Sequence, residues 1–121
     1  MIAARYLVDD VDSAVAFYTD RLGFVLDQQY GPAMAIVVRD GFALWLAGPV
    51  SSAAQPMPDG RTPTPGGWNR VVLVVDDLDP LVASLTESGT TFRNAPFGGV
   101  GGRQVLIEDP SGNPIELFEG G

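Results

Sequence analysis

The side chains of this sequence that could take part in chemistry are a tryptophan and a few charged residues set in apolar segments. Trp45 lies near the end of one such segment, and Arg5 lies near the start of another. Arg70 and Glu116 occupy two further apolar segments. An indole can stack on a planar ligand, a guanidinium can hold an anion, and a carboxylate can hold a cation or act as a general base. These residues therefore point to the recognition of a small molecule.

The composition excludes several other kinds of site. The chain has no cysteine, so disulfides, thiolate zinc sites, iron–sulfur clusters and thiol nucleophiles are excluded. Its formal charge of -8 disfavours nucleic acid and anionic lipid as partners and would attract a cationic small molecule. No long apolar run and no secretory signal is visible, so we expect a cytoplasmic protein without a membrane partner.

An internal repeat indicates how these residues are positioned. The segment RYLVDDVDSAVAFYTD, residues 5–20, aligns without a gap with VLVVDDLDPLVASLTE, residues 72–87. Asp10 then coincides with Asp77, and related residues follow on both sides. The 121 residues suit a single domain, 1–121, built from two copies of one structural unit.

Each copy begins with a strand and continues into an amphipathic helix. The short, β-branched runs at 2–8 and 71–75 are typical of strands. Asp12 and Asp79 are the expected helix N-caps, and Pro80 falls where its missing N–H costs nothing. Both helices have apolar residues on one face, and their expected ends are at Gly23 and Gly89.

Three more strands are expected in each copy. They lie near 24–30, 33–39 and 42–47 in the first, and near 91–94, 103–108 and 114–119 in the second. The first βαβββ module is thus predicted at 1–47 and the second at 69–121. Residues 48–68 contain five prolines and four glycines and are predicted to be a linker or lid. The glycine cluster at 98–102 is predicted to be a flexible hairpin loop.

The alternation of side chains along a strand predicts a mostly apolar binding face. Ala3 and Arg5 fall on one face of the first strand, and Arg70 falls on the same face of its repeat. Trp45 and Glu116 join that face. Further candidate wall residues are Trp68, Tyr30, Met34, Phe92, Phe97 and Phe118. The alternatives are that Trp45 and the other aromatic residues only pack in the core, and that Arg70 and Glu116 only form an ion pair.

Two motifs give the sequence a family resemblance. DVDSAVAFYTDRLGF, residues 10–24, and IEDPSGNPIELFE, residues 107–119, resemble the vicinal oxygen chelate superfamily. That superfamily includes glyoxalase I, extradiol dioxygenases, fosfomycin-resistance enzymes and bleomycin-resistance binding proteins. The resemblance implies an α+β fold of two βαβββ modules. Their curved mixed sheets would surround a shared cavity, with the helices outside, and a homodimer would be common.

The resemblance also implies where metal ligands would lie in a metal-dependent relative. Those positions fall on Ala3, Trp45, Arg70 and Glu116. Only one of the four is a metal-binding residue type, and the chain contains no histidine. We therefore expect no metal and no other cofactor.

Three functions stay open on the sequence. The favoured one is a binding protein of the bleomycin-resistance type, which sequesters an aromatic or amphipathic compound such as an antibiotic; a cationic compound would suit its acidic surface. The alternative is a metal-free isomerase, cyclase or lyase in which Glu116 is the base and Arg70 stabilises an oxyanion. A metal-dependent glyoxalase or dioxygenase is the third, and it would need ligands from a partner chain.

Overall fold

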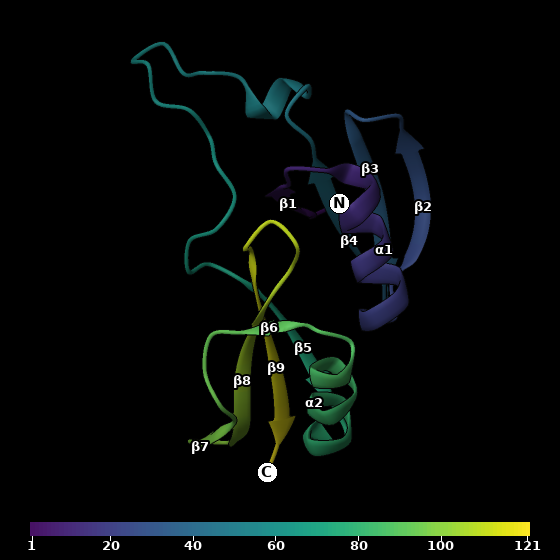
Figure 1. The fold of residues 1–121 in the computed structure, drawn as a ribbon, viewed down its shortest axis with the longest axis vertical. Coiled ribbons are helices and arrows are strands. Elements are labelled where there is room, and N and C mark those ends of the chain that lie inside the picture. Colours follow the sequence, from purple (N-terminus) through teal and green to yellow (C-terminus); the bar gives the residue numbers. More distant parts are fainter. The chain divides into compact units, whose positions relative to one another are not determined.

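The computed structural model describes all 121 residues and divides them into two compact units, Met1–Gly66 and Gly67–Gly121 (Figure 1). Each unit consists of one α-helix and one mixed sheet, which confirms the predicted α+β fold. The division falls in the proline- and glycine-rich segment that the sequence predicts to be a linker. Each unit is described below by itself.

The first unit has the predicted βαβββ order. Its elements are β1 (Ala4–Leu7), α1 (Val11–Leu22), β2 (Val25–Tyr30), β3 (Met34–Arg39) and β4 (Phe42–Ala47), followed by a short 3-10 helix at Ser52–Ala54. The strand order in the sheet is β1-β4-β3-β2. β1 runs parallel to β4, whereas β4, β3 and β2 are antiparallel neighbours. A parallel pair needs a long crossover, which α1 and the hairpins supply.

The second unit repeats this plan with one addition. Its elements are β5 (Val71–Val75), α2 (Leu78–Glu87), β6 (Thr91–Phe92), β7 (Phe97–Gly99), β8 (Gly102–Glu108) and β9 (Pro114–Gly120). The order β5-β9-β8-β6 matches the first sheet, with β5 parallel to β9. The additional strand β7 pairs with β8, so the glycine cluster forms part of a hairpin and is not only a loop. β6 is limited to two residues, shorter than the predicted strand.

The predicted helix N-caps were wrong by two residues in both copies. The N-cap of α1 is Asp10, whose Oδ1 accepts hydrogen bonds from the backbone N–H groups of Asp12 and Ser13. In α2 the N-cap is Asp77, but its side chain makes no capping bond. The N–H of Leu78 instead donates to Glu119 Oε1 at 2.7 Å. A carboxylate from the last strand therefore replaces the local cap.

One face of each sheet is covered and the other is open. In the first unit the covered face carries Val37, Leu44 and Leu46, all fully buried, and α1 contacts β2, β3 and β4. In the second unit Ile107 and Leu117 are fully buried in the same way. The open faces also carry apolar side chains: on β5, for example, Val72 is 48% and Val74 is 70% exposed. No helix of the chain is long and apolar enough to cross a membrane.

Candidate functional site

Trp45 is positioned by the centre of the first sheet. It lies on β4, directly opposite Arg5 of β1 on one side and Ile36 of β3 on the other. Residues directly opposite in a ladder point to the same face. That face is the open one, because Leu44 and Leu46, the neighbours of Trp45 along the strand, are fully buried on the helix side.

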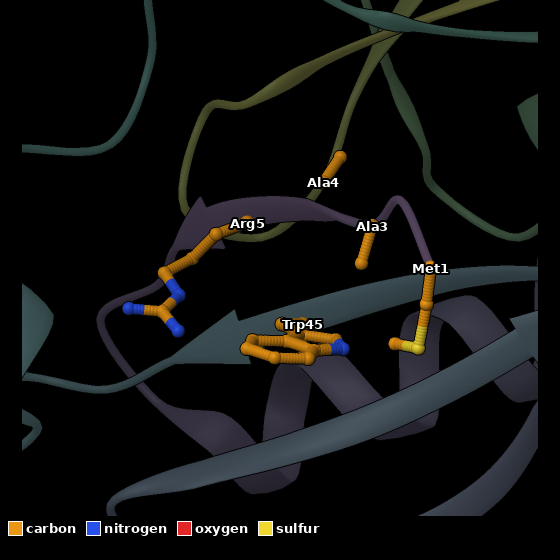
Figure 2. Close-up of a pocket in the computed structure, with 5 residues that line it drawn as sticks. All are labelled: Met1, Ala3, Ala4, Arg5 and Trp45. Atoms are coloured by element: carbon orange, nitrogen blue, oxygen red, sulfur yellow. The ribbon is translucent and has the colours of Figure 1, made fainter.

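A pocket of about 460 Å³ lies at this indole (Figure 2). It is lined by Met1, Ala3, Ala4, Arg5 and Trp45. The guanidinium carbon of Arg5 lies 5.1 Å from the centroid of the Trp45 ring, within the range of a cation–π contact. Figure 2 shows Arg5 at one end of the indole, and Ala3 and Met1 at the end that carries the ring nitrogen. Alanine, methionine and indole carbons make the pocket mainly apolar.

The two polar groups of this pocket have hydrogen-bonding capacity to spare. Trp45 Nε1 is the only buried side-chain nitrogen or oxygen in the chain that lacks a hydrogen-bond partner. The Arg5 guanidinium makes its cation–π contact and no hydrogen bond or ion pair. An unsatisfied buried donor costs stability, so such groups commonly mark a function.

In the second unit the open face carries the Arg70–Glu116 ion pair. Glu116 lies opposite Val72 in the β5–β9 ladder. Arg70 Nε and Nη2 donate to Glu116 Oε1 at 3.0 and 2.8 Å, and Nη1 donates to the backbone oxygen of Trp68 at 3.3 Å. The two side chains are 30% and 12% exposed. The pair is therefore partly buried. Two nitrogens of Arg70 donate to the same oxygen of Glu116, which holds the two side chains together.

Sequence reasoning missed Arg93, which holds together the start of the second unit. Its Nε donates to Glu108 at 2.7 Å, and its other two nitrogens donate to the backbone oxygens of Gly67 and Gly112 at 2.8 and 2.9 Å. The same guanidinium lies 4.6 Å from the Trp68 ring centroid. These partners are up to 26 residues away in the sequence. No local pattern could have revealed them.

The remaining predicted wall residues fall into separate places. Tyr30 pairs with Met34, and Met34 pairs with Ala47, which places them on the Trp45 face of the first sheet. Phe97 and Phe118 both lie opposite Gln104, on the Glu116 face of the second sheet. Phe92 lies opposite the fully buried Ile107, on the other face of that sheet. Trp68 precedes β5 and is 68% exposed.

The four residues at which the family resemblance implies metal ligands do not fit a metal ion. Ala3, Trp45 and Arg70 offer no donor that a divalent cation accepts. The remaining carboxylate, Glu116, has Oε1 occupied by the Arg70 guanidinium. Nowhere in the chain do three or more His, Cys, Asp or Glu side chains gather so that they could hold a metal ion.

Comparison with known structures supports the fold over the full length. The structure resembles TnmS3, an antibiotic binding protein from Streptomyces sp. CB03234, with 26% identity, a TM-score of 0.71, and coverage of 100% of this chain and 97% of that one. A superfamily member from Sphaerobacter thermophilus is 30% identical, with a TM-score of 0.68 and coverage of 98% and 97%. Lactoylglutathione lyase from Agrobacterium tumefaciens is 22% identical, with a TM-score of 0.76 and coverage of 99% and 93%.

The comparison with curated proteins found no match. The family description Glyoxalase/Bleomycin resistance protein/Dioxygenase superfamily matches residues 2–117, nearly the whole sequence. The repeated βαβββ plan and the two motifs lead to the same assignment. The chain therefore belongs to the Glyoxalase/Bleomycin resistance protein/Dioxygenase superfamily.

Proposed function

We propose that the chain is a small-molecule binding protein of the bleomycin-resistance type, which sequesters an aromatic or amphipathic compound such as an antibiotic without changing it. The observation that carries the proposal is the pocket at Trp45, with its apolar lining, an Arg5 guanidinium without an ion-pair partner and a buried Trp45 N–H without a hydrogen-bond partner. Apolar concave sites with a few polar groups are typical of ligand binding. TnmS3 is named as an antibiotic binding protein, which agrees with this proposal.

The alternative of a metal-free enzyme receives less support. A general base must be free to take a proton from its substrate. Here Glu116 Oε1 accepts two guanidinium hydrogen bonds, and Arg70 is turned toward this carboxylate and the Trp68 carbonyl. Both proposed catalytic groups are therefore engaged with each other. A metal-dependent reaction lacks a ligand set, as described above.

Replacing Trp45 by alanine is expected to weaken the binding of a planar aromatic compound about tenfold or more. The reason is the loss of the apolar area that the indole buries, together with stacking, which contributes on the order of 1 kcal/mol beyond that area. A library of planar antibiotics and dyes is screened by the rise in melting temperature, which grows with the concentration of a true ligand. Trp68→Ala is the matched control, since it removes the other tryptophan and leaves this pocket intact.

Two outcomes of this screen would contradict the proposal. If Trp45→Ala and Trp68→Ala weaken every hit equally, the Trp45 pocket is not the binding site. If mass spectrometry finds the best hit chemically altered after incubation with the protein, the chain is an enzyme and does not act by sequestration. A ligand recovered unchanged, with affinity lost only in Trp45→Ala, supports the proposal.

We also propose that the protein acts in the cytoplasm and as a homodimer. β1 and β5 are each paired on one side only, and exposed strand edges favour association. Light scattering at micromolar concentration is expected to give twice the mass of the chain. A monomer mass across the concentration range used for ligand binding would remove the dimer from the proposal.

A further inference from the structure

We infer that the pocket at Trp45 selects planar aromatic ligands that carry a negative charge, such as an aromatic carboxylate, sulfonate or phenolate. The inference rests on the proposed function and narrows its ligand class. It reverses the expectation, drawn from the acidic composition, that a cationic compound would be preferred. Its basis is that two hydrogen-bond donors at this pocket, the Arg5 guanidinium and Trp45 Nε1, have no hydrogen-bond partner in the protein.

Arg5 differs from most other arginines of the chain in having no acidic partner. Every basic residue of the sequence is an arginine, and there are seven. Five of them form ion pairs with an aspartate or glutamate: Arg39, Arg61, Arg70, Arg93 and Arg103. The Arg5 guanidinium has none, although acidic residues outnumber basic ones by fifteen to seven. Its charge is therefore available to a ligand.

The contact between Arg5 and the indole leaves this charge usable. A guanidinium that lies over an aromatic ring can still donate from its edge to a carboxylate, because its five N–H bonds lie in its own plane. The ring also fixes the position of the cation in the pocket, 5.1 Å from the ring centroid. An aromatic anion could thus pack in the apolar pocket while its charged group meets Arg5.

Trp45 Nε1 also favours a ligand that offers a hydrogen-bond acceptor. An indole N–H can only donate, so the group that satisfies it must be an acceptor. The nitrogen lies at the end of the ring away from Arg5, beside Ala3 and Met1 (Figure 2). Met1 is 96% exposed and its side chain can be displaced. The two donors at opposite ends of the indole favour a flat ligand with acceptor oxygens.

The local charge outweighs the charge of the whole protein at contact distance. The attraction between two charges falls with their separation, so a guanidinium in contact with the ligand acts more strongly on it than charges spread over the surface. The dispersed negative charge of the chain is screened over about 8 Å at physiological ionic strength. Long-range attraction can speed the approach of a cation, but the group that the bound ligand meets is a guanidinium.

The test uses three aromatic dyes that differ in charge. Anilinonaphthalene sulfonate is the anion, N-phenyl-1-naphthylamine is the neutral analogue of the same ring system, and proflavine is the cation. Binding is followed by the fluorescence or absorbance of the dye itself, which also serves for Trp45→Ala. Contact with the pocket is followed by quenching of Trp45 fluorescence in a Trp68→Phe background, which leaves one tryptophan and keeps an aromatic ring beneath Arg93. We expect the anion to bind about tenfold more tightly than the neutral dye, the size of one charge-assisted hydrogen bond.

The decisive variant is Arg5→Met, with Arg61→Met as its control. Both remove one positive charge, but Arg61 lies in the exposed segment between the modules and pairs with Asp59. Arg5→Met is expected to abolish the preference for the anion and to change the affinity for the neutral dye less than threefold. Arg61→Met is expected to leave the preference unchanged, and Arg5→Lys to retain part of it.

The outcomes separate this inference from the proposed function. If the dyes bind and Trp45→Ala weakens them, but the anion has no advantage or keeps it in Arg5→Met, the inference is wrong and the binding function stands. If Trp45→Ala affects none of the dyes, the binding function itself fails. Tighter binding of proflavine than of the sulfonate would also overturn the inference.

Discussion

Replacing Gly102 by alanine is expected to destabilise the second unit by about 3 kcal/mol, the size seen when a well-packed site is overfilled. A Cβ at this position would lie 2.0 Å from the backbone oxygen of Glu119 and 3.1 Å from the Cα of Gly120. Neither atom can move freely, because Gly102 and Gly120 are paired in the β8–β9 ladder. Urea unfolding of the two proteins measures the difference.

The effect of Gly102→Ala is expected to extend beyond β8 and β9. Glu119, whose backbone a new methyl group would push, also provides the carboxylate that caps α2 through the N–H of Leu78. We expect the helix of the second unit to lose hydrogen-exchange protection at its first turn along with β9. Gly98→Ala is the control, since a Cβ there has no atom within 4 Å, and its effect should stay within about 0.5 kcal/mol. Equal losses of unfolding free energy in Gly102→Ala and Gly98→Ala would contradict the expected clash of a Cβ at position 102 with β9.

The fold could be predicted from the sequence because its signals are local and occur twice. The strands, the two helices and the glycine ends follow from patterns a few residues long, and the repeat confirms each pattern in a second copy. The helix starts were misplaced because two aspartates, Asp10 and Asp12, both have N-cap chemistry and the sequence does not choose between them. β7 was missed because a glycine-rich segment has little strand propensity.

The candidate site could be predicted only in part. Side-chain alternation assigned Arg5 and Trp45 to one face, and it is the strand register that shows them directly opposite each other. The sequence offered an Arg70–Glu116 ion pair only as an alternative, because the two residues are 46 residues apart and meet only through the β5–β9 register. For the same reason the sequence could not show that Arg5 has no acidic partner. That fact changes the expected charge of the ligand.

Replacing Arg70 by methionine is expected to cost about 2 kcal/mol of unfolding free energy. Removing one partner of a fully buried pair costs about 3–5 kcal/mol, because the other charge is left without compensation. This pair is only partly buried, with side chains 30% and 12% exposed, so water can reach the abandoned carboxylate and the loss is smaller. Thermal and urea unfolding measure it, with Arg61→Met as the control for an exposed pair, expected at less than about 0.5 kcal/mol.

The double variant Arg70→Met/Glu116→Leu separates a structural ion pair from a ligand anchor. It removes both charges and leaves groups of similar size, so stability is expected to recover to within about 1 kcal/mol of the parent. If Arg70 and Glu116 only compensate each other's charge, this variant also keeps the parent's affinity for the dyes that Trp45 binds. An affinity lost in the double variant while stability recovers would show that Arg70 or Glu116 contacts the ligand. If Arg70→Met is as stable as Arg61→Met, the unpaired Glu116 carboxylate does not destabilise the fold, and the predicted loss of unfolding free energy is wrong.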